Sequence, residues 1–368
     1  MDQLHVGIVG AAGRGASFFS SFTENAHTRI TALCDLNAEG LARAAALVGE
    51  VKTYTDYEQM LDDAGLDLVM IGTPMPLHVP QSIAALRRDL HVLCEVPAAV
   101  NLDEARELVQ AANRSRGKYM MAENYCYIRS NVIVREMVRA GLFGEVYFGE
   151  GEYLHELKGL NEITKWRRKW QTGINGATYP THSFGPVYQW MNQRAVAVSC
   201  TGSGHHYEDP RGDAYENEDS ITLLCRMEHG GLVNVRVDML SNRPHCMAYY
   251  SLQGTKGCYE APRAEPWEAT RVWLADRCSD PNEWRPLSDF EEEFSPARYR
   301  RLSAAAFASG HWGADHLVVL EFVEAVREGR DPDVGIHQAM DMTLPGLVSQ
   351  QSIAQGGAWL PVPDSRTW

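Results

Sequence analysis

Two side chains that can exchange protons near neutral pH stand close together in the middle of the chain. Tyr179 and His182 belong to the segment Tyr-Pro-Thr-His. An unperturbed phenol titrates at about 10 and an unperturbed imidazole at about 6.5, so together they offer a proton donor and a proton acceptor. If a helix begins here and continues to Met191, residues three apart project to the same side. Tyr179 and His182 are therefore candidate catalytic residues, although a core tyrosine beside a capping histidine would give the same pattern.

Three more residues have side chains suited to binding a small molecule that carries rings and hydroxyl groups. His155 follows a strand-like segment and could hydrogen-bond a hydroxyl group, although an exposed strand end would look the same. Trp166 could stack on such a ring and Arg167 could hydrogen-bond its substituents, with packing of Trp166 in a domain interface as the alternative. Residues 205–209 contain two histidines and two acids, but adjacent strand residues point to opposite faces. We therefore expect no metal site.

A glycine-rich turn follows the first strand-like segment. It occupies residues 7–15, Gly-Ile-Val-Gly-Ala-Ala-Gly-Arg-Gly, and opens a helical pattern, which is the order found in dinucleotide-binding folds. Gly10 permits a tight turn, Gly15 lets helix and strand approach closely, and the helix N-terminus attracts a pyrophosphate. Ala12 stands where the middle glycine usually lies, so we expect the cofactor to be slightly displaced. The predicted cofactor-binding residues of this turn are Gly10, Ala12, Gly13, Arg14 and Gly15.

Asp35 ends the second strand-like segment. A carboxylate at this position accepts hydrogen bonds from the ribose hydroxyls and repels a 2′-phosphate, so NAD is expected rather than NADP. The alternative is an acid that only caps a helix beginning near Asn37. A strand, a glycine turn, a helix, a second strand and an acid in this order favour the cofactor site.

The first third of the chain alternates short apolar segments with segments of helical spacing. This alternation predicts an α/β domain with a doubly wound parallel sheet of the Rossmann type. The strand-like segments are residues 4–9, 30–34, 66–71, 91–94 and 118–121. We expect this NAD-binding domain to cover residues 1–122.

The pattern changes in the remainder of the chain. After a helix expected at 131–140, longer segments with alternating apolar residues predict an α+β domain with an open, mostly antiparallel sheet. These strand-like segments are residues 146–154, 195–202, 220–227, 232–239 and 247–253.

The last hundred residues combine an irregular region with two helices. Residues 261–310 are rich in Pro, Arg, Glu and Trp and predict a long loop, and helical spacing returns at 314–328 and 336–355. We assign residues 123–355 to a substrate-binding and oligomerisation domain. The tail, residues 356–368, is expected to pack on the body of the protein.

The composition indicates a folded protein without nucleic-acid or membrane partners. The 368 residues are 45% hydrophobic, and the formal charge of -14 repels phosphate backbones and anionic headgroups. No segment approaches the run of about 18 apolar residues that a spanning helix needs. The eight cysteines form no Cys-x-x-Cys pair and the first strand begins almost at once, so we expect a cytoplasmic protein. An uncovered sheet face predicts a homo-oligomer, a dimer or tetramer.

Three further segments resemble the Gfo/Idh/MocA superfamily of NAD(P)-dependent sugar and cyclitol oxidoreductases. They are residues 71–78 (Ile-Gly-Thr-Pro-Met-Pro-Leu-His), 91–97 (His-Val-Leu-Cys-Glu-Val-Pro) and 140–146 (Ala-Gly-Leu-Phe-Gly-Glu-Val). The resemblance implies that the nicotinamide is lined by Thr73, Pro74, His78, Glu95 and Pro97. This chain has Met75 and Val96 where the superfamily usually has asparagine and lysine. That lysine commonly contacts the hydroxyl group that is oxidised, so its loss argues against ordinary dehydrogenase chemistry.

The second half of the chain narrows the resemblance. Residues 166–170 (Trp-Arg-Arg-Lys-Trp), 175–186 (Asn-Gly-Ala-Thr-Tyr-Pro-Thr-His-Ser-Phe-Gly-Pro) and the C-terminal 362–368 resemble glycoside hydrolase family 109. Members of that family keep NAD bound and hydrolyse α-N-acetylgalactosaminides. The resemblance implies that Tyr179 and His182 contact the substrate beside the nicotinamide. The Tyr-x-His that ends at His155 also resembles a motif of the same group.

Three functions are compatible with these residues. The first is cleavage of a glycoside in which hydride leaves carbon 3 of the sugar for NAD, the aglycone is eliminated, water adds and the hydride returns. The second is a simple NAD-dependent sugar or cyclitol dehydrogenase that releases NADH. The third is a non-catalytic sensor of sugar or NAD, which the absence of lysine at Val96 would suit.

Overall fold

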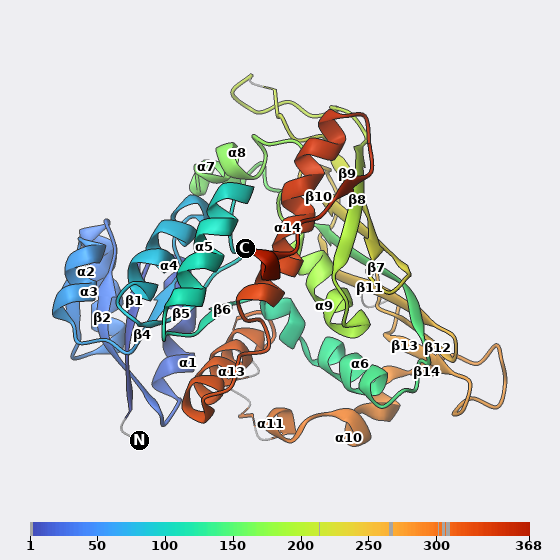
Figure 1. Ribbon diagram of the computed structural model, residues 1–368, viewed down its shortest axis with the longest axis horizontal. Helices are drawn as coiled ribbons and strands as arrows, with labels where there is room; N and C mark the ends of the chain where they lie inside the picture. Colours follow the sequence, from blue (N-terminus) through green and yellow to red (C-terminus); the bar gives the residue numbers. More distant parts are fainter. Residues whose placement is uncertain (1–2, 213, 265–267, 301, 304–305, 307–309) are drawn as a thin grey trace. The chain divides into compact units, whose positions relative to one another are not determined.

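The chain forms two compact units in the computed structural model (Figure 1). The model describes residues 3–212, 214–264, 268–300, 302–303, 306 and 310–368. The first unit comprises residues 1–127, 303–340 and 365–368, and the second unit comprises residues 128–302 and 341–364. The chain therefore returns to the first unit twice after leaving it.

The first unit is built on a six-stranded parallel sheet in the order β3-β2-β1-β4-β5-β6. Its strands are β1 (Leu4–Val9), β2 (Thr28–Cys34), β3 (Lys52–Tyr54), β4 (Leu68–Ile71), β5 (His91–Cys94) and β6 (Tyr119–Met121). The strand order reverses beside β1, which is where doubly wound folds bind dinucleotides, and the predicted Rossmann fold is confirmed. Strand β3 was not predicted, because its three edge residues are largely exposed and form no apolar run.

Helices connect these strands and cover the sheet. They are η1 (Arg14–Phe18), α1 (Phe19–Thr23), α2 (Ala38–Val48), α3 (Tyr57–Asp63), η2 (Met75–Leu77), α4 (His78–Leu86), α5 (Leu102–Arg114), η3 (Asn124–Tyr127) and α13 (Ala314–Glu328). Side chains of Asn37, Asp56 and Asn101 cap α2, α3 and α5 by accepting backbone hydrogen bonds. Helices α4 and α5 lie side by side, and α13 packs against α1 although the sequence separates them widely (Figure 1).

The second unit is built on a nine-stranded sheet in the order β14-β13-β12-β11-β7-β10-β9-β8-β15. The predicted strands are observed as β7 (Val146–Leu154), β8 (Ala195–Gly202), β9 (Ser220–Met227), β10 (Leu232–Asp238) and β11 (Cys246–Gly254). Strands β7 and β10 pair in parallel and the other neighbours pair antiparallel, so the expected mostly antiparallel sheet is confirmed.

Four strands at the two edges of this sheet were not predicted. They are β12 (Gly257–Glu260), β13 (Arg271–Leu274), β14 (Arg285–Pro286) and β15 (Leu360–Pro361). The expectation of one long irregular loop over 261–310 was wrong for the described residues, which also contain η4 (Leu287–Phe290), α10 (Glu291–Phe294) and α11 (Ala297–Arg300). These elements have two to four residues and none of the four strands is a continuous run of buried residues, so the sequence pattern does not reveal them.

One helix covers the centre of the second sheet. Helix α9 (Thr181–Met191) contacts β7, β10 and β11, and a Cβ atom on Gly151 of β7 would lie 1.9 Å from the Ser183 carbonyl oxygen, so glycine is required there. Helix α6 (Arg129–Arg139) packs against α9 in turn. Side chains on alternate strand positions, including Leu224 and Leu232, face away from α9 and are only half-buried.

The longest helix, α14 (Ile336–Ala354), begins in the first unit and continues in the second. It contains Pro345 and carries several polar side chains. Within the described residues, the protein has no helix that combines the length and the apolar character needed to cross a bilayer.

Candidate active site

The turn after β1 has room only for glycine at two positions. Gly10 has a φ of +78°, and a Cβ atom there would lie 2.5 Å from the Gly72 carbonyl oxygen. A Cβ atom on Gly15 would lie 2.8 Å from the Gly10 carbonyl oxygen, whereas one on Gly13 would meet only that oxygen, at 3.8 Å. The backbone therefore forms a tight cradle with an open outer rim, which fits the close approach of a pyrophosphate.

Ala12 and Asp35 lie beside this turn. The Ala12 amide donates a hydrogen bond to Asp35 Oδ2 and the Asn37 amide donates one to Asp35 Oδ1, both at 2.9 Å. The Ala12 methyl group lies against α2, since a Cβ atom on Gly40 would come within 2.6 Å of it. The Asp35 carboxylate is thus fixed at the end of β2, where its position fits the ribose hydroxyls of NAD.

The side chains predicted to line the nicotinamide all stand at the carboxyl end of the parallel sheet. Thr73, Pro74 and His78 follow β4, and Glu95 and Pro97 follow β5. Arg14 and Glu95, both predicted to contact the cofactor, form an ion pair of 2.7 Å with each other. Met75 and Val96, the two departures from the superfamily pattern, are each only 3% exposed. The position usually held by lysine is therefore a buried apolar position in this protein.

His78 connects the two backbone segments that follow β4 and β5. Its Nε2 atom lies 2.9 Å from the Thr73 carbonyl oxygen, and its Nδ1 atom lies 2.9 Å from the Pro97 carbonyl oxygen. A neutral imidazole can donate only one of these hydrogen bonds, whereas the protonated ring donates both. Burial by itself would lower the pKa of His78, but Cys94 and the two carbonyl groups raise it to about 9. His78 is therefore a buried cation that holds the two segments together.

In the second unit, Tyr179 and His182 lie together at the start of α9. Their ring centroids are 5.0 Å apart and the rings are nearly perpendicular, at 87°. His182 is buried in the first turn of the helix, and its carbonyl oxygen accepts a hydrogen bond of 2.6 Å from the Tyr250 hydroxyl. Tyr179 is half-buried just before the helix. The helix start that the spacing predicted is therefore present, and it brings both rings to one place.

A second tyrosine and histidine stand at the end of β7. The Tyr153 hydroxyl lies 2.8 Å from His155 Nδ1. The Tyr153 ring centroid is 5.3 Å from that of His182 and 5.6 Å from that of Tyr179. Burial, together with neighbouring basic side chains, lowers the pKa of His155 to about 4. His155 is therefore a neutral imidazole at physiological pH.

Trp166 and Arg167 stand where α8 (Arg167–Trp170) begins. The Arg167 guanidinium lies 4.5 Å from the centre of the Trp166 ring and donates a hydrogen bond of 2.8 Å to Gln171 Oε1. It is also one of the basic groups that lower the pKa of His155. Arg167 is thus close enough to act electrostatically on the histidine, while Trp166 stacks on Arg167.

His245 is a member of this group that the sequence did not reveal. Its ring centroid lies 4.5 Å from that of His155. Strand β11 pairs antiparallel with β7, and Cys246 lies opposite Leu154, so the residue before β11 lies beside the residue after β7. Only this pairing identifies His245. We call Tyr153, His155, Tyr179, His182 and His245 the Tyr–His cluster.

The histidine-rich segment 205–209 has other partners. The backbone amide of His206 donates a hydrogen bond of 2.6 Å to Asp219 Oδ2, and His206 Nδ1 lies 2.7 Å from the same oxygen. Asp209 forms an ion pair with Arg168. Within the part of the chain that the structure describes, no three His, Cys, Asp or Glu side chains are grouped so that they could hold a metal ion.

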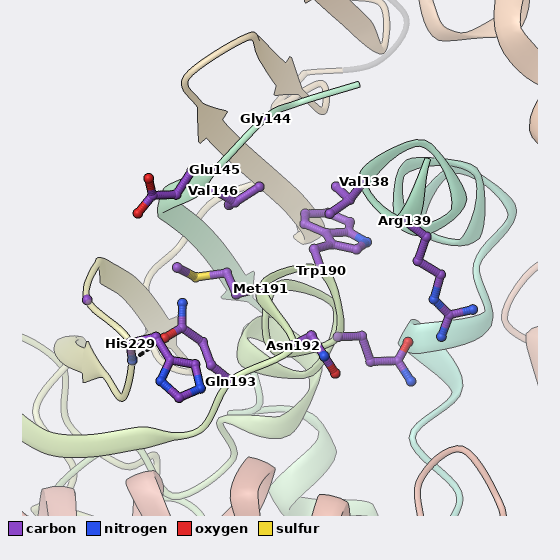
Figure 2. A pocket seen from close by; sticks show the side chains of 12 residues that line it. Val138, Arg139, Gly144, Glu145, Val146, Trp190, Met191, Asn192, Gln193 and His229 are labelled. Atoms are coloured by element: carbon purple, nitrogen blue, oxygen red, sulfur yellow. Dashed lines mark hydrogen bonds between the residues drawn. The ribbon is translucent and has the colours of Figure 1, made fainter. Parts of the chain in front are cut away.

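A cavity of about 530 Å³ lies elsewhere in the second unit (Figure 2). Trp190 and Met191 at the end of α9 line it together with Arg139 of α6. Gln193 Oε1 accepts a hydrogen bond of 2.7 Å from the His229 backbone amide at its rim. The residues that line this cavity are all described and include no member of the Tyr–His cluster, so the cavity is separate from the candidate site.

Comparison with known proteins defines the class of enzyme first. Residues 4–123 match the oxidoreductase family with an NAD-binding Rossmann fold, and residues 127–367 match the C-terminal domain of glycosyl hydrolase 109. Levoglucosan dehydrogenase, solved in complex with NADH and levoglucosan, has a similar fold with a TM-score of 0.82 and 21% identity over 98% of this chain and 100% of that chain. Myo-inositol 2-dehydrogenase from Lactobacillus plantarum also has a similar fold, with a TM-score of 0.76 and 17% identity over 98% of this chain and 100% of that chain. The protein is therefore an enzyme of the Gfo/Idh/MocA type with an NAD-binding Rossmann domain.

Sequence relatives define the family within that class. The glycosyl hydrolase family 109 protein of Saccharopolyspora erythraea is 31% identical, over 99% of this chain and 83% of the relative. The family 109 protein of Streptomyces niveus is also 31% identical, over 99% of this chain and 77% of the relative. This protein belongs to glycosyl hydrolase family 109, as its Trp-Arg and Tyr-Pro-Thr-His segments indicated.

Replacing His78 with Gln should remove a pH-dependent contribution to stability. The folded protein holds this proton with a pKa of about 9, above the value of about 6.5 in an unfolded chain. The stabilisation is therefore fully present below about pH 6.5 and is lost as the pH rises through about 9. Between about pH 6 and pH 10 the wild type should lose about 1 to 3 kcal/mol more unfolding free energy than His78→Gln in urea titrations.

The exposed His27 of the same unit gives the matched control, and His27→Gln should keep the pH dependence of the wild type. If His78→Gln and the wild type lose stability in parallel, His78 is not a buried cation.

Proposed function

We propose that this protein cleaves a glycoside through transient oxidation of the sugar ring, with the cofactor restored to NAD in each turnover. NAD, when bound, accepts a hydride from a ring carbon and later returns it. The observation that carries the proposal is the Tyr–His cluster of the second unit, which supplies proton donors and acceptors. Membership of glycosyl hydrolase family 109 supports it, because the family model matches residues 127–367, which include the Tyr–His segment, and a family 109 relative aligns over 99% of this chain.

The chemistry of the cluster argues against direct displacement at the anomeric carbon. Displacement needs a pair of carboxyl groups about 5 to 9.5 Å apart on either side of the bond. Residues 175–186, which contain Tyr179 and His182, include no Asp or Glu. A ketone at carbon 3 instead makes the proton on carbon 2 removable by a side chain of ordinary basicity. Tyr179 is proposed to remove that proton as its phenolate, formed when the phenol proton passes to an imidazole of the Tyr–His cluster.

The remaining steps follow from the position of that proton. Its electron pair forms a double bond between carbons 1 and 2, and the bond to the aglycone breaks. His182 is proposed to polarise the ketone or to protonate the departing oxygen. Water then adds across the double bond, a proton returns to carbon 2, and the ketone is reduced again.

The other candidate residues are proposed to hold the sugar. His155 is neutral because its pKa is about 4, so it can exchange a hydrogen bond with a hydroxyl group without placing a charge beside it. Trp166 offers an aromatic face to the sugar ring, and Arg167 offers donors to an acyl substituent. We propose that the first unit binds NAD through the glycine turn, Asp35 and the segments after β4 and β5.

A simple sugar or cyclitol dehydrogenase is the second candidate. It is favoured by the solved structures of similar fold, which include two dehydrogenases. It is opposed by the buried Val96, because an apolar side chain cannot activate the hydroxyl group that is oxidised. A non-catalytic sensor is a third possibility and would show no turnover.

We also propose that the enzyme works in the cytoplasm. None of its eight cysteines, all of them among the described residues, forms a disulfide, and six of them are buried. Thiols persist in this form in a reducing compartment.

Turnover in deuterated water should separate the two enzymatic functions. Given nitrophenyl α-N-acetylgalactosaminide and related glycosides, the purified NAD-loaded protein should release nitrophenol and a sugar with deuterium at carbon 2, because that proton exchanges with solvent in the elimination. NADH absorbance should not accumulate. Mass spectrometry or NMR of the sugar reads the label. Unlabelled product, or NADH formed in proportion to substrate, would leave the dehydrogenase as the better description.

Replacing Tyr179 with Phe should lower turnover by about 10² to 10⁴ if the phenol acts as a general acid or base. Circular dichroism should show that the fold is retained. Tyr188→Phe is the matched control, because Tyr188 lies on α9 and donates a hydrogen bond of 2.8 Å to Asp341. That variant should change stability more than turnover. Equal activity of Tyr179→Phe and the wild type would contradict the assignment.

We propose that two copies of the protein associate through the face of the second sheet that points away from α9. Phe148 of β7, Leu224 of β9 and Leu232 of β10 are half-buried on alternate positions of three neighbouring strands. Apolar side chains gathered on one face are a common feature of subunit interfaces. A second copy would cover them by presenting the same surface.

Light scattering at micromolar concentration should therefore give the mass of a dimer or a tetramer. Leu224→Arg should shift the mass toward the monomer, because it places a charge in the centre of the proposed interface. Leu47→Arg, at a position that is 80% exposed on α2, should leave the mass unchanged. A monomeric wild type would refute the interface.

A further inference from the structure

Arg14 of the glycine turn carries its charge between two carboxylates. Its Nε atom donates a hydrogen bond of 2.7 Å to Glu95 Oε1. Its two terminal nitrogens donate to the two oxygens of Asp315, at 2.7 and 2.9 Å. One positive and two negative charges give this Arg14–Glu95–Asp315 network a net charge of about -1.

Asp315 is fully buried, and its surroundings keep it ionised. Asn124 Nδ2 donates a hydrogen bond of 2.7 Å to it, and His311 Nδ1 lies 3.2 Å away. Burial alone would raise the pKa of Asp315, but the hydrogen bonds from His311 and Arg14 hold it well below its usual range. The carboxylate therefore stays negative throughout the pH range in which enzymes work.

Two residues beside this carboxylate have a strained backbone conformation. His311 and Trp312 adopt left-handed φ angles of 54° and 56°, which non-glycine residues rarely do. A Cβ atom on Gly310 would lie 2.3 Å from Asp315 Oδ2. Strain of this kind persists where the surrounding structure fixes the conformation, and it gathers at functional sites.

The network lies toward the nicotinamide side of the cofactor edge. Arg14 follows β1, Glu95 follows β5 and Asn124 follows β6, and all three strands end at the same edge of the parallel sheet. Asp35, which we propose binds the adenosine ribose, follows β2 on the other side of β1. A dinucleotide laid across this edge places its nicotinamide toward β4 and β5, as is general for doubly wound folds.

We propose that the Arg14–Glu95–Asp315 network makes the protein prefer oxidised NAD over NADH. The nicotinamide ring is positively charged in NAD and neutral in NADH, so the negative charge of this network stabilises the oxidised form selectively, against the opposing positive charge of His78 at the same edge. Tighter binding of NAD lowers the reduction potential of the bound couple. Reduced cofactor then gives its hydride, two electrons with one proton, back to a ketone more readily. This inference rests on NAD binding and is independent of glycoside cleavage.

The test is the ratio of the two dissociation constants, measured by calorimetric titration of the full-length protein with NAD and with NADH. Every variant is titrated at one pH, about 8.5, so that His78, whose pKa is about 9, contributes equally to each ratio. Asp315→Asn removes one negative charge with little change in shape. It should reduce the ratio of the NADH constant to the NAD constant about three- to tenfold. A tenfold change corresponds to a rise of about 30 mV in the potential of this two-electron couple.

Glu95→Gln is the second variant, because it removes the other carboxylate at a less buried position and should change the ratio in the same direction. Glu321→Gln is the matched control. Glu321 is buried on the same helix and pairs with Arg330 through two hydrogen bonds of 2.6 and 2.9 Å. It lies six residues, about 9 Å, further along α13 than Asp315. This variant should lower the melting temperature without changing the ratio.

A purely structural role gives a different result. If Asp315→Asn and Glu95→Gln weaken the binding of NAD and NADH by equal factors, the network only shapes the glycine turn and the proposal fails. A ratio that changes equally in Glu321→Gln would also overturn it, because the effect would then not depend on distance from the cofactor edge.

Discussion

The cofactor edge depends on a backbone contact that leaves no space for side chains. A Cβ atom on Gly72 would lie 2.6 Å from the backbone nitrogen of Gly15, and one on Gly10 would meet the Gly72 carbonyl oxygen at 2.5 Å. The glycine turn after β1 is therefore packed directly against the backbone that follows β4. Because this turn cannot shift, the side chain of Arg14 leaves it at a fixed place, within reach of the carboxylates of Glu95 and Asp315. The rigid glycine contact is thus what makes a precise charge arrangement possible.

Much of this fold could be predicted because its central strands follow one of two simple patterns. Strands β4 and β5 are buried on both faces and appear as apolar runs, while β9 and β10 alternate between buried and half-buried side chains. The short edge strands carry neither pattern. They exist because a longer neighbour offers unpaired backbone groups, as β8 does for β15, and such pairing is a tertiary effect with no local signal.

In the candidate site, too, some contacts follow from local spacing in the sequence and others only from the tertiary fold. A spacing of three residues at a helix start was enough to bring Tyr179 and His182 together, and the period of two along β7 places Tyr153 and His155 on one side. His245 joins them only through the register of β11 against β7. Asp315 lies 301 residues after Arg14 in the chain, and nothing near either residue identifies the pair. Residue type and spacing therefore predicted that Tyr179 and His182 lie together, but not which groups surround them.

Proton transfer is assigned to tyrosine and histidine because the described residues of the cofactor edge offer no lysine or free arginine side chain for it. Val96 is a buried apolar residue after β5, and the charge of Arg14, the cation of the glycine turn, is offset by two carboxylates. His78 is a cation, but both of its ring nitrogens face backbone carbonyl groups, so it has no proton to exchange with a substrate. In the proposed reaction the proton of the oxidised hydroxyl group and that of carbon 2 must both pass to neutral side chains. The Tyr–His cluster is suited to that task because a neutral imidazole such as that of His155 can accept a proton, and a tyrosine can accept one after its own proton has passed to a neighbouring imidazole.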